Sequence, residues 1–343
     1  MALLFTDGFD SYDSTSSLDN RYEFVEDPWT WDFDAGRQGG GAIVCPGSPG
    51  SSRVVCNVGT VLPVGGGTLH MGFWLRLDSA PAAAVPIIGL VDGNGTRIVS
   101  LQVNTFGILQ HATAFGSTLG LLGSRIVTDG EWHWVEFRWS TNAVATWQCY
   151  VDAILQWSTS NQPTASTSIA VAFELIAPIG PMIVLDDVIC YDNSSGYPQT
   201  ADFPIGPSII TPLRPTADLS VDFLRSTGST NFDLVNEVAL SELAWVQSDV
   251  PTDQDLYSYE DLTIEPDRIH AAVVTSFIRN PDIGDVDFNN LAFSHSTQNT
   301  ATARTAPIFG QYRQNSFPLD PDTNGQWHQG TINSAAFGIR VAP

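Results

Sequence analysis

The chain has 343 residues, of which 43% are hydrophobic, and its 37 acidic and 14 basic residues give a formal net charge of −23. Every basic residue is an arginine. This balance excludes nucleic-acid binding through phosphate contacts, which need many cationic side chains, and it disfavours binding to an anionic membrane. Because one domain usually holds ~100–200 residues, we expect two domains, each with its own core.

The N-terminal sequence MALLFTDGFD lacks the basic segment, apolar core and cleavage site of a signal peptide, so we expect none. We expect no transmembrane segment either, because the most apolar stretch, residues 169–185, contains Glu174 and two prolines. The four cysteines form no Cys-x-x-Cys pair, which argues against a zinc knuckle or a redox motif. Cys45 and Cys56 flank a loop of small residues. The sequence is compatible with a disulfide between them and with two separate buried thiols.

Short apolar runs rich in β-branched and aromatic residues follow one another along the chain. They occupy residues 70–77, 84–92, 97–104, 132–140, 146–158 and 182–192, then 218–226, 231–237, 255–262, 268–280, 289–296 and 335–342. Turn dipeptides such as Asp-Gly and Asn-Gly separate them, a spacing typical of a sandwich or barrel. Residues 239–246 have the apolar spacing of one or two helical turns. We therefore predict an all-β fold.

The segment DGEWHWVEFRWS, residues 129–140, resembles a catalytic or metal-binding cluster at first sight. On a strand, however, alternation sends Trp132, Trp134, Glu136 and Arg138 to one face and His133 to the other. His133 has no second histidine at metal-ligand spacing. We predict a turn followed by a core strand, with Glu131, Glu136 and Arg138 as solvated or cross-strand charges.

The strand pattern is interrupted at residues 192–208, where three prolines and small polar residues gather. We interpret this stretch as the connection between two β-sandwich (jelly-roll-like) domains in tandem. The expected boundaries are 1–195 for the first domain, 196–206 for the linker and 207–343 for the second domain.

The first domain resembles the laminin-G-like, concanavalin A-type jelly roll of bacteriophage virion proteins. The resemblance rests on FTDGFDSYD, GFWLRL, DGEWHWVEFRW, CYVDAILQW and IVLDDVICYD, in this order over residues 1 to about 195. The second domain is similar to a β-rich module of phage structural proteins, through LRPTADLSVDF, NFDLVNE, DLYSYEDL, IHAAVVTSFIRN and DPDTNGQWHQGTINSAAFGIRV. The resemblance implies a virion component, in a tail fibre or tip, a spike or a capsid decoration.

A glycoside hydrolase on this fold needs two carboxylates that converge on one bond, ~5–5.5 Å apart in a retaining enzyme. No run of same-face acids in the first domain meets that requirement, and no nucleophile elbow or phosphate loop is present. We therefore expect no catalytic residues and no enzymatic activity.

A glycan-binding site needs an aromatic platform and a few polar groups. Trp29, Trp31, Trp147 and Trp157 are the candidates for such a platform. The alternative is that these rings pack in the core, as most tryptophans of a sandwich do.

Some proteins of the resembled fold hold calcium where the first strand meets the last. Asp7, Asp10, Asp186 and Asp187 are the candidate ligands here, because a hard cation takes ~6–8 oxygens. Asp186 and Asp187 point to opposite faces of a strand, so at most one would join the N-terminal pair. The alternative is that these acids cap turns or accept hydrogen bonds from backbone amides.

A second calcium candidate is DPDTNG, with Asp320, Asp322 and Asn324 as ligands. It matches the opening of a calcium loop, but Thr331 stands where the bidentate Glu belongs, and the segment also suits an ordinary β-turn. No cofactor is otherwise expected.

Together these observations lead us to expect a non-enzymatic virion structural protein that acts by assembly and surface display. The alternative is a lectin-like adhesin that attaches the virion to its host. The expected partners are other virion proteins, further copies of the chain, with a trimer as one option, and a host-surface glycan; nucleic acid and membrane are not expected. Without a signal peptide or a membrane span, the chain would be made in the host cytoplasm and built into the virion. An exposed apolar face would favour the structural protein, and an open aromatic groove the adhesin.

Overall fold

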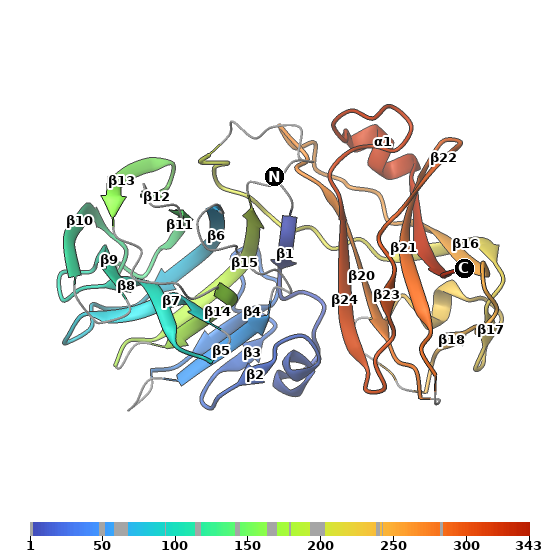
Figure 1. Cartoon of the computed structure of the whole chain (residues 1–343), viewed down its shortest axis with the longest axis horizontal. Helices are drawn as coiled ribbons and strands as arrows, with labels where there is room; N and C mark the ends of the chain where they lie inside the picture. Colours follow the sequence, from blue (N-terminus) through green and yellow to red (C-terminus); the bar gives the residue numbers. More distant parts are fainter. Residues whose placement is uncertain are drawn as a thin grey trace. The chain divides into compact units, whose positions relative to one another are not determined.

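The computed structural model describes residues 3–47, 52–57, 68–92, 94–113, 118–140, 145–162, 170–177, 180–192, 203–237, 241, 243–281 and 284–343. The chain forms two compact units, the first ending at Ile210 and the second beginning at Thr211. Their regular structure is almost entirely β-strand, which confirms the predicted fold class (Figure 1). No helix in the described residues is long and apolar enough to cross a membrane.

The first unit is a sandwich of two antiparallel sheets. The eight-stranded sheet has the order β13 (Ile154–Gln162), β12 (Ala145–Val151), β11 (Trp132–Ser140), β6 (Thr68–Leu77), β15 (Ile183–Asp192), β4 (Ala42–Cys45) and β3 (Thr30–Asp32), with β1 (Leu3–Asp7) paired to β15. The seven-stranded sheet has the order β10 (Thr118–Ile126), β9 (Ile108–Thr113), β8 (Arg97–Val103), β7 (Val85–Asp92), β14 (Ala170–Ala177), β5 (Ser52–Asn57) and β2 (Phe24–Val25). A short 3₁₀ helix, η1 (Thr15–Asn20), follows β1.

Alternation along the strands builds the core between these sheets. On β6, Leu69, Phe73 and Leu75 are buried, and the ring of Phe73 meets that of Phe137 on β11 edge to face. Phe5 on β1 packs in the same way against Phe173 on β14, which joins the two sheets. The strand predicted for residues 132–140 is therefore confirmed as a core strand.

The strand predicted for residues 146–158 is divided by a tight turn. Asp152 and Ala153 have φ of 51° and 63° and join β12 to β13. Two successive positive φ angles suit the right-handed twist of a hairpin.

The four cysteines are free and buried, so Cys45 and Cys56 are separate buried thiols rather than a disulfide.

The second unit has a six-stranded antiparallel sheet and two small two-stranded sheets. The large sheet has the order β16 (Pro215–Val221), β19 (Gln254–Tyr259), β25 (Ala336–Val341), β21 (Asp287–Ser294) and β22 (Thr297–Thr300), with β23 (Arg304–Thr305) paired to β21. The small sheets are β17 (Leu224–Arg225) with β18 (Val246–Gln247), and β20 (Ala272–Ile278) with β24 (Gln311–Phe317). Helices η2 (Phe232–Leu234) and α1 (Gln329–Ser334) complete the unit.

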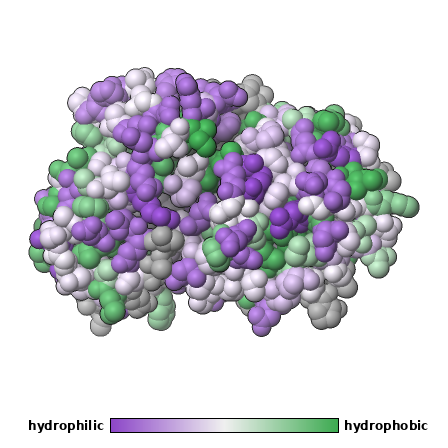
Figure 2. All heavy atoms as spheres, turned by 180° about the vertical axis from the view of Figure 1, so that it is seen from behind, coloured by the Kyte–Doolittle hydropathy of each residue, from purple (hydrophilic) through white to green (hydrophobic). Residues whose placement is uncertain are grey.

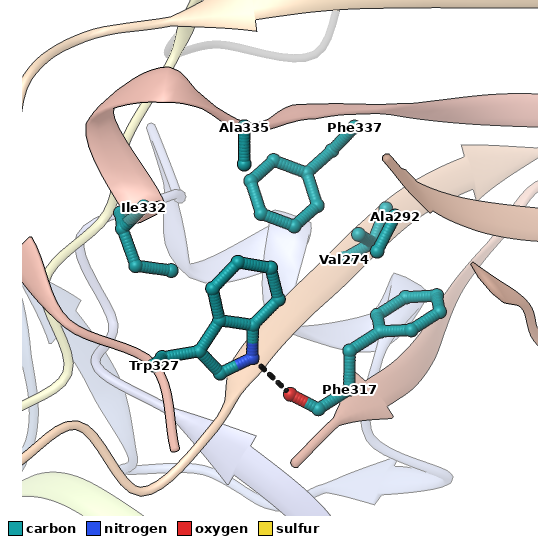
Figure 3. Packing of buried hydrophobic residues seen from close by; sticks show 7 residues of the cluster. All are labelled: Val274, Ala292, Phe317, Trp327, Ile332, Ala335 and Phe337. Carbon is teal, nitrogen blue, oxygen red and sulfur yellow. Dashed lines mark hydrogen bonds between the residues drawn. The ribbon is translucent and has the colours of Figure 1, made fainter. Parts of the chain in front are cut away.

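The core of the second unit is centred on Trp327, which is 1% exposed. Its indole Nε1 donates a 2.7 Å hydrogen bond to the carbonyl oxygen of Phe317, and Phe337 and Ile332 pack beside the ring (Figure 3). A buried tryptophan usually finds such an acceptor, because its N–H is costly to bury unpaired. This cluster is the main apolar anchor of the unit.

Two predicted features differ from the structure. Residues 231–237 contain η2 rather than a strand, because the backbone amides of Asn231 and Phe232 donate to the carboxylate of Asp218, at 2.9 Å and 2.7 Å. In the segment 239–246, the strand β18 begins at Val246, and residues 238–240 and 242 lie outside the described residues.

The boundary between the two units also differs from the predicted one. The expected linker was 196–206 and the expected second domain 207–343, whereas residues 203–210 belong to the first unit. Residues 193–202 lie outside the described residues.

Candidate functional site

One face of the eight-stranded sheet points away from the second sheet and carries aromatic, arginine and carboxylate side chains. Opposite one another on β6 and β11 lie His70 and Arg138, Gly72 and Glu136, Trp74 and Trp134, and Arg76 and Trp132. The prediction that four residues of β11 share one face is confirmed, because each of them pairs with an outer residue of β6. We call this surface the outer face.

Residues 203–210, which we call the strap, lie on the outer face. The ring of Phe203 is 4.9 Å from that of His70 and 5.3 Å from that of Tyr150, both edge to face. Burial lowers the pKa of His70 to about 3, with a further contribution from the charge of Arg138. The imidazole of His70 is therefore neutral under the strap at physiological pH.

The strap is also held by polar contacts. The indole Nε1 of Trp74 donates to the carbonyl oxygen of Ser208 at 2.9 Å. Further along, the backbone amide of Ile210 donates to Oδ1 of Asp187, also at 2.9 Å. A stretch that reads as a flexible linker is thus fixed to the sheet.

Glu136 is the central anchor of the strap. Its Oε1 accepts hydrogen bonds from the amide of Ile205 at 2.8 Å and the hydroxyl of Tyr191 at 3.3 Å. Its Oε2 accepts from the amide of Gly206 at 2.9 Å and Nε1 of Trp134 at 3.0 Å. The side chain is fully buried, and burial raises the pKa of Glu136. The expectation of a solvated or cross-strand charge at Glu136 is therefore wrong.

Asp7 differs from the other calcium candidates in the groups that its carboxylate binds. Its carboxylate accepts hydrogen bonds from the hydroxyls of Tyr12 and Tyr22, at 2.5 Å and 2.9 Å, and from the amide of Phe9. Nε of the buried Arg21 lies 3.1 Å from its Oδ2. Asp7 thus neutralises a buried guanidinium.

Asp10, Asp186 and Asp187 do lie near one another. A register shift in β15 follows Asp186, and Asp187 has a φ of 49°, which is rare for a residue other than glycine. Burial raises the pKa of Asp187 to about 8, and the charges of Asp186 and Asp10 add to this. Burial likewise raises the pKa of Asp186 to about 6.

Backbone amides hold two of these carboxylates. The amide of Arg37 donates to Asp186 at 2.9 Å, and that of Gly41 donates to Asp10 at 2.7 Å. The guanidinium of Arg37 lies 4.2 Å from the ring centre of Trp74. The predicted alternative, acids that accept hydrogen bonds from backbone amides, describes these contacts.

Asp320 shapes a turn in the second unit. The side chain is fully buried, and its oxygens accept hydrogen bonds from the amide of Asp322 at 3.1 Å and the hydroxyl of Thr323 at 3.0 Å. Asn324 has a φ of 52° and donates its amide to the carbonyl of Asp320 at 2.8 Å. In the described parts of the chain, no three His, Cys, Asp or Glu side chains are placed to share a metal ion. Calcium binding at either predicted site stays a prediction.

Three of the four candidate platform tryptophans are buried. Trp29, Trp147 and Trp157 are 1%, 4% and 5% exposed. Trp147 stacks on the buried His111 with ring centres 4.2 Å apart, and Trp157 meets the same ring edge to face. Burial lowers the pKa of His111 to about 3. These three rings offer no open face to a sugar, as the core-packing alternative expected.

Trp31 differs, because it is only half-buried in the middle of β3. Its Nε1 donates to the carbonyl oxygen of Phe9 at 2.8 Å. The ring of Phe33 lies 6.5 Å from it, tilted by 41°, and Phe33 is 63% exposed. Our sequence reasoning missed Phe33, which lies in the turn directly after β3.

The second unit exposes large apolar side chains around β16, β17 and β18. We call this group the β16–β18 patch; it consists of Leu219, Val221, Leu224, Leu243, Trp245 and Val250, which are 60%, 38%, 68%, 86%, 43% and 53% exposed. Ser226 joins its parts, because its amide donates to the carbonyl of Trp245 at 2.9 Å and its hydroxyl to that of Leu243 at 3.3 Å. Figure 2 shows that hydrophobic residues also reach the surface among hydrophilic ones on the face it draws.

The chain matches no protein-family model and no curated protein sequence. Solved structures of similar fold include an endo-β-1,4-glucuronan lyase from the fungus Trichoderma reesei, with 14% identity over 49% of this chain and 90% of that one and a TM-score of 0.39. Cellulose induced protein Cip1 shares 12% identity over 55% of this chain and 96% of its own, with a TM-score of 0.42. The binding domain of Paraclostridial Mosquitocidal Protein 1 shares 13% identity over 55% of this chain and 48% of its own, with a TM-score of 0.42.

These comparisons correct one expectation from the sequence. Polysaccharide lyases are among the solved structures of this fold, so the conclusion that the chain is not an enzyme is contradicted. Binding domains of toxins share the fold as well. At such low identity the likeness establishes the fold alone: this chain is built on a β-sandwich of jelly-roll type.

Proposed function

We propose that this chain is an assembly and attachment protein of a virion, in which the second unit binds further copies of the chain and the first unit is displayed. The observation that carries the proposal is the β16–β18 patch. Exposed large apolar side chains that gather in one part of a surface commonly mark protein interfaces.

A second copy of the chain can cover this patch, although the net charge opposes self-association over the rest of the surface. With a net charge of −23, two copies repel each other over most of their surfaces. Contact through apolar side chains avoids that repulsion and removes Leu224 and Leu243 from water. Closed rotational symmetry is the common outcome for such self-contacts, and a trimer is compatible with it.

The virion setting comes from the sequence resemblance in both halves of the chain. It implies other virion proteins as partners and a role in a tail fibre or tip, a spike or a capsid decoration. Purified particles, dissociated and separated by mass, test this setting. The proposal expects the chain at a fixed stoichiometric copy number, and its absence from particles contradicts the setting.

Sedimentation velocity of the full chain over a range of concentrations tests the assembly. We expect an oligomer for the natural sequence and a shift to monomer for Leu224→Asp combined with Leu243→Asp, because each change adds a repelling charge to the patch. Phe106→Asp is the matched control, since Phe106 is 73% exposed in the first unit. A natural chain that stays monomeric at high concentration, or a doubly substituted chain that assembles normally, contradicts the assembly proposal.

A second candidate function is glycan binding by the first unit, which would make the protein an adhesin for a host-surface glycan. The observation in its favour is that Trp31 is only half-buried and lies beside the exposed Phe33.

A further inference from the structure

We infer that Trp31 and Phe33 form a binding site for a neutral glycan at the edge strand β3. Their ring centres are 6.5 Å apart and the ring planes meet at 41°, which makes a bent rather than a flat aromatic surface. Aromatic faces bind the C–H side of a sugar ring by apolar contact, and two adjacent rings can hold two positions along one glycan. The site lies in the first unit and does not depend on assembly through the β16–β18 patch.

Trp31 is held in place before any ligand binds. Its Nε1 donates to the carbonyl oxygen of Phe9 at 2.8 Å, and its backbone amide donates to the hydroxyl of Thr15 at 3.0 Å. Gly41 leaves the room that the indole needs, because a Cβ there would lie 2.6 Å from Nε1 of Trp31. A fixed ring loses little side-chain freedom on binding, so the platform is preorganised.

Carboxylates beside the rings supply hydrogen-bond acceptors. Asp32 and Asp34 are both exposed and flank Phe33 in the chain. The amide of Asp34 donates to Oδ1 of Asp32 at 3.0 Å, which shapes the turn after β3. Sugar hydroxyls are donors to such oxygens, and hydrogen bonds to a charged acceptor are the stronger kind.

The same carboxylates determine the class of glycan. Two exposed acids next to the rings, on a chain with a net charge of −23, repel uronates and sulfated sugars. A neutral polysaccharide is not repelled and has hydroxyls to donate. The chemistry of the site therefore selects neutral over acidic glycans.

Affinity gel electrophoresis of the full chain tests this inference, with dextran, galactomannan and xyloglucan as neutral probes and alginate and hyaluronate as acidic ones. We expect at least one neutral polysaccharide to retard the natural chain and the acidic ones not to. Phe33→Ala should weaken that binding at least fivefold, and Trp31→Ala with Phe33→Ala should abolish it. Phe106→Ala, which removes another exposed ring of the first unit, should bind within twofold of the natural chain.

Phe33→Ala alone keeps the test valid, because Phe33 is mostly exposed and its loss leaves the anchoring contacts of Trp31 in place. Equal melting temperatures of the variants establish that they are folded. The inference is overturned if no neutral probe retards the natural chain, if Phe33→Ala binds as tightly as the natural chain, or if the acidic probes bind more tightly than the neutral ones.

Discussion

The outer face of the first unit and the β16–β18 patch of the second unit differ in what covers them. In the first unit, the strap lies on the outer face, and Glu136 beneath it is 0% exposed. In the second unit, Leu224 and Leu243 are 68% and 86% exposed. The first unit thus buries a charge that sequence reasoning assigned to solvent, while the second leaves leucines in water. This difference is the basis of our proposal that the second unit contacts another chain through the β16–β18 patch.

Trp327→Ala is the change with the largest expected effect, and it acts on the second unit. It removes the ring that fills the core and the hydrogen bond to the carbonyl of Phe317, and a buried Trp→Ala change costs about 4 kcal/mol. Differential scanning calorimetry of the full chain should show one transition shifted down and the other retained. A shift equivalent to less than about 1 kcal/mol would mean that this cluster is not the main core of the unit.

Glu136→Ala measures how firmly the strap closes the first unit. Four hydrogen-bond donors lose their acceptor, two of them backbone amides of the strap, and we expect a loss of about 3 kcal/mol of unfolding free energy. Denaturant unfolding measures this loss. Glu131→Ala, on an exposed residue before the same strand, is the control and should change stability by less than about 0.5 kcal/mol. Equal losses in the two variants would contradict the anchoring role.

The buried His111 makes the first unit sensitive to acid. The pKa of His111 is about 3 in the folded state and 6.5 in the unfolded chain. Between these two pH values the unfolded chain therefore binds a proton that the folded chain does not. Stability from this group is full above pH 6.5 and falls by about 1.4 kcal/mol per pH unit below it. His111→Phe should reduce the loss between pH 6.5 and pH 5 by about 2 kcal/mol. Denaturant unfolding at several pH values tests this, and a variant with the unchanged pH slope contradicts it.

Leu243→Ser should have the smallest effect. The side chain is mostly in water already, so the unfolding free energy of the monomer should change by less than about 0.5 kcal/mol. Chemical denaturation at low protein concentration measures this value. A large loss would show that Leu243 stabilises the fold itself, which would weaken the case for an interface.

The sequence predicts the all-β fold well, because alternation and turn residues are local signals. It does not predict the strap. Phe203, Gly206 and their neighbours look like linker composition, and their partner Glu136 lies 70 positions away from Gly206 in the chain. Only the tertiary fold brings that carboxylate to the backbone amides.

Prediction of the candidate sites from the sequence is limited in the same way. Alternation places residues on a face of a strand but does not say which face another element covers, so Trp147 and Trp31 look alike in the sequence and differ in burial. The segment 231–237 has a strand-like pattern, yet Asp218 accepts two of its amides and makes a 3₁₀ turn. The absence of a catalytic pattern in the sequence did not exclude an enzyme, because residues far apart in the chain can meet in the folded protein.

Hydroxyl-radical footprinting of Trp245 across a range of concentrations of the full chain tests the central claim most directly. Trp245 is 43% exposed in the single chain and lies in the β16–β18 patch, whereas Phe33 is 63% exposed in the first unit. Assembly through the patch predicts that oxidation of Trp245 falls several-fold as the chain assembles, while oxidation of Phe33 stays constant. Constant oxidation of Trp245 over the concentrations at which the chain assembles would contradict the claim.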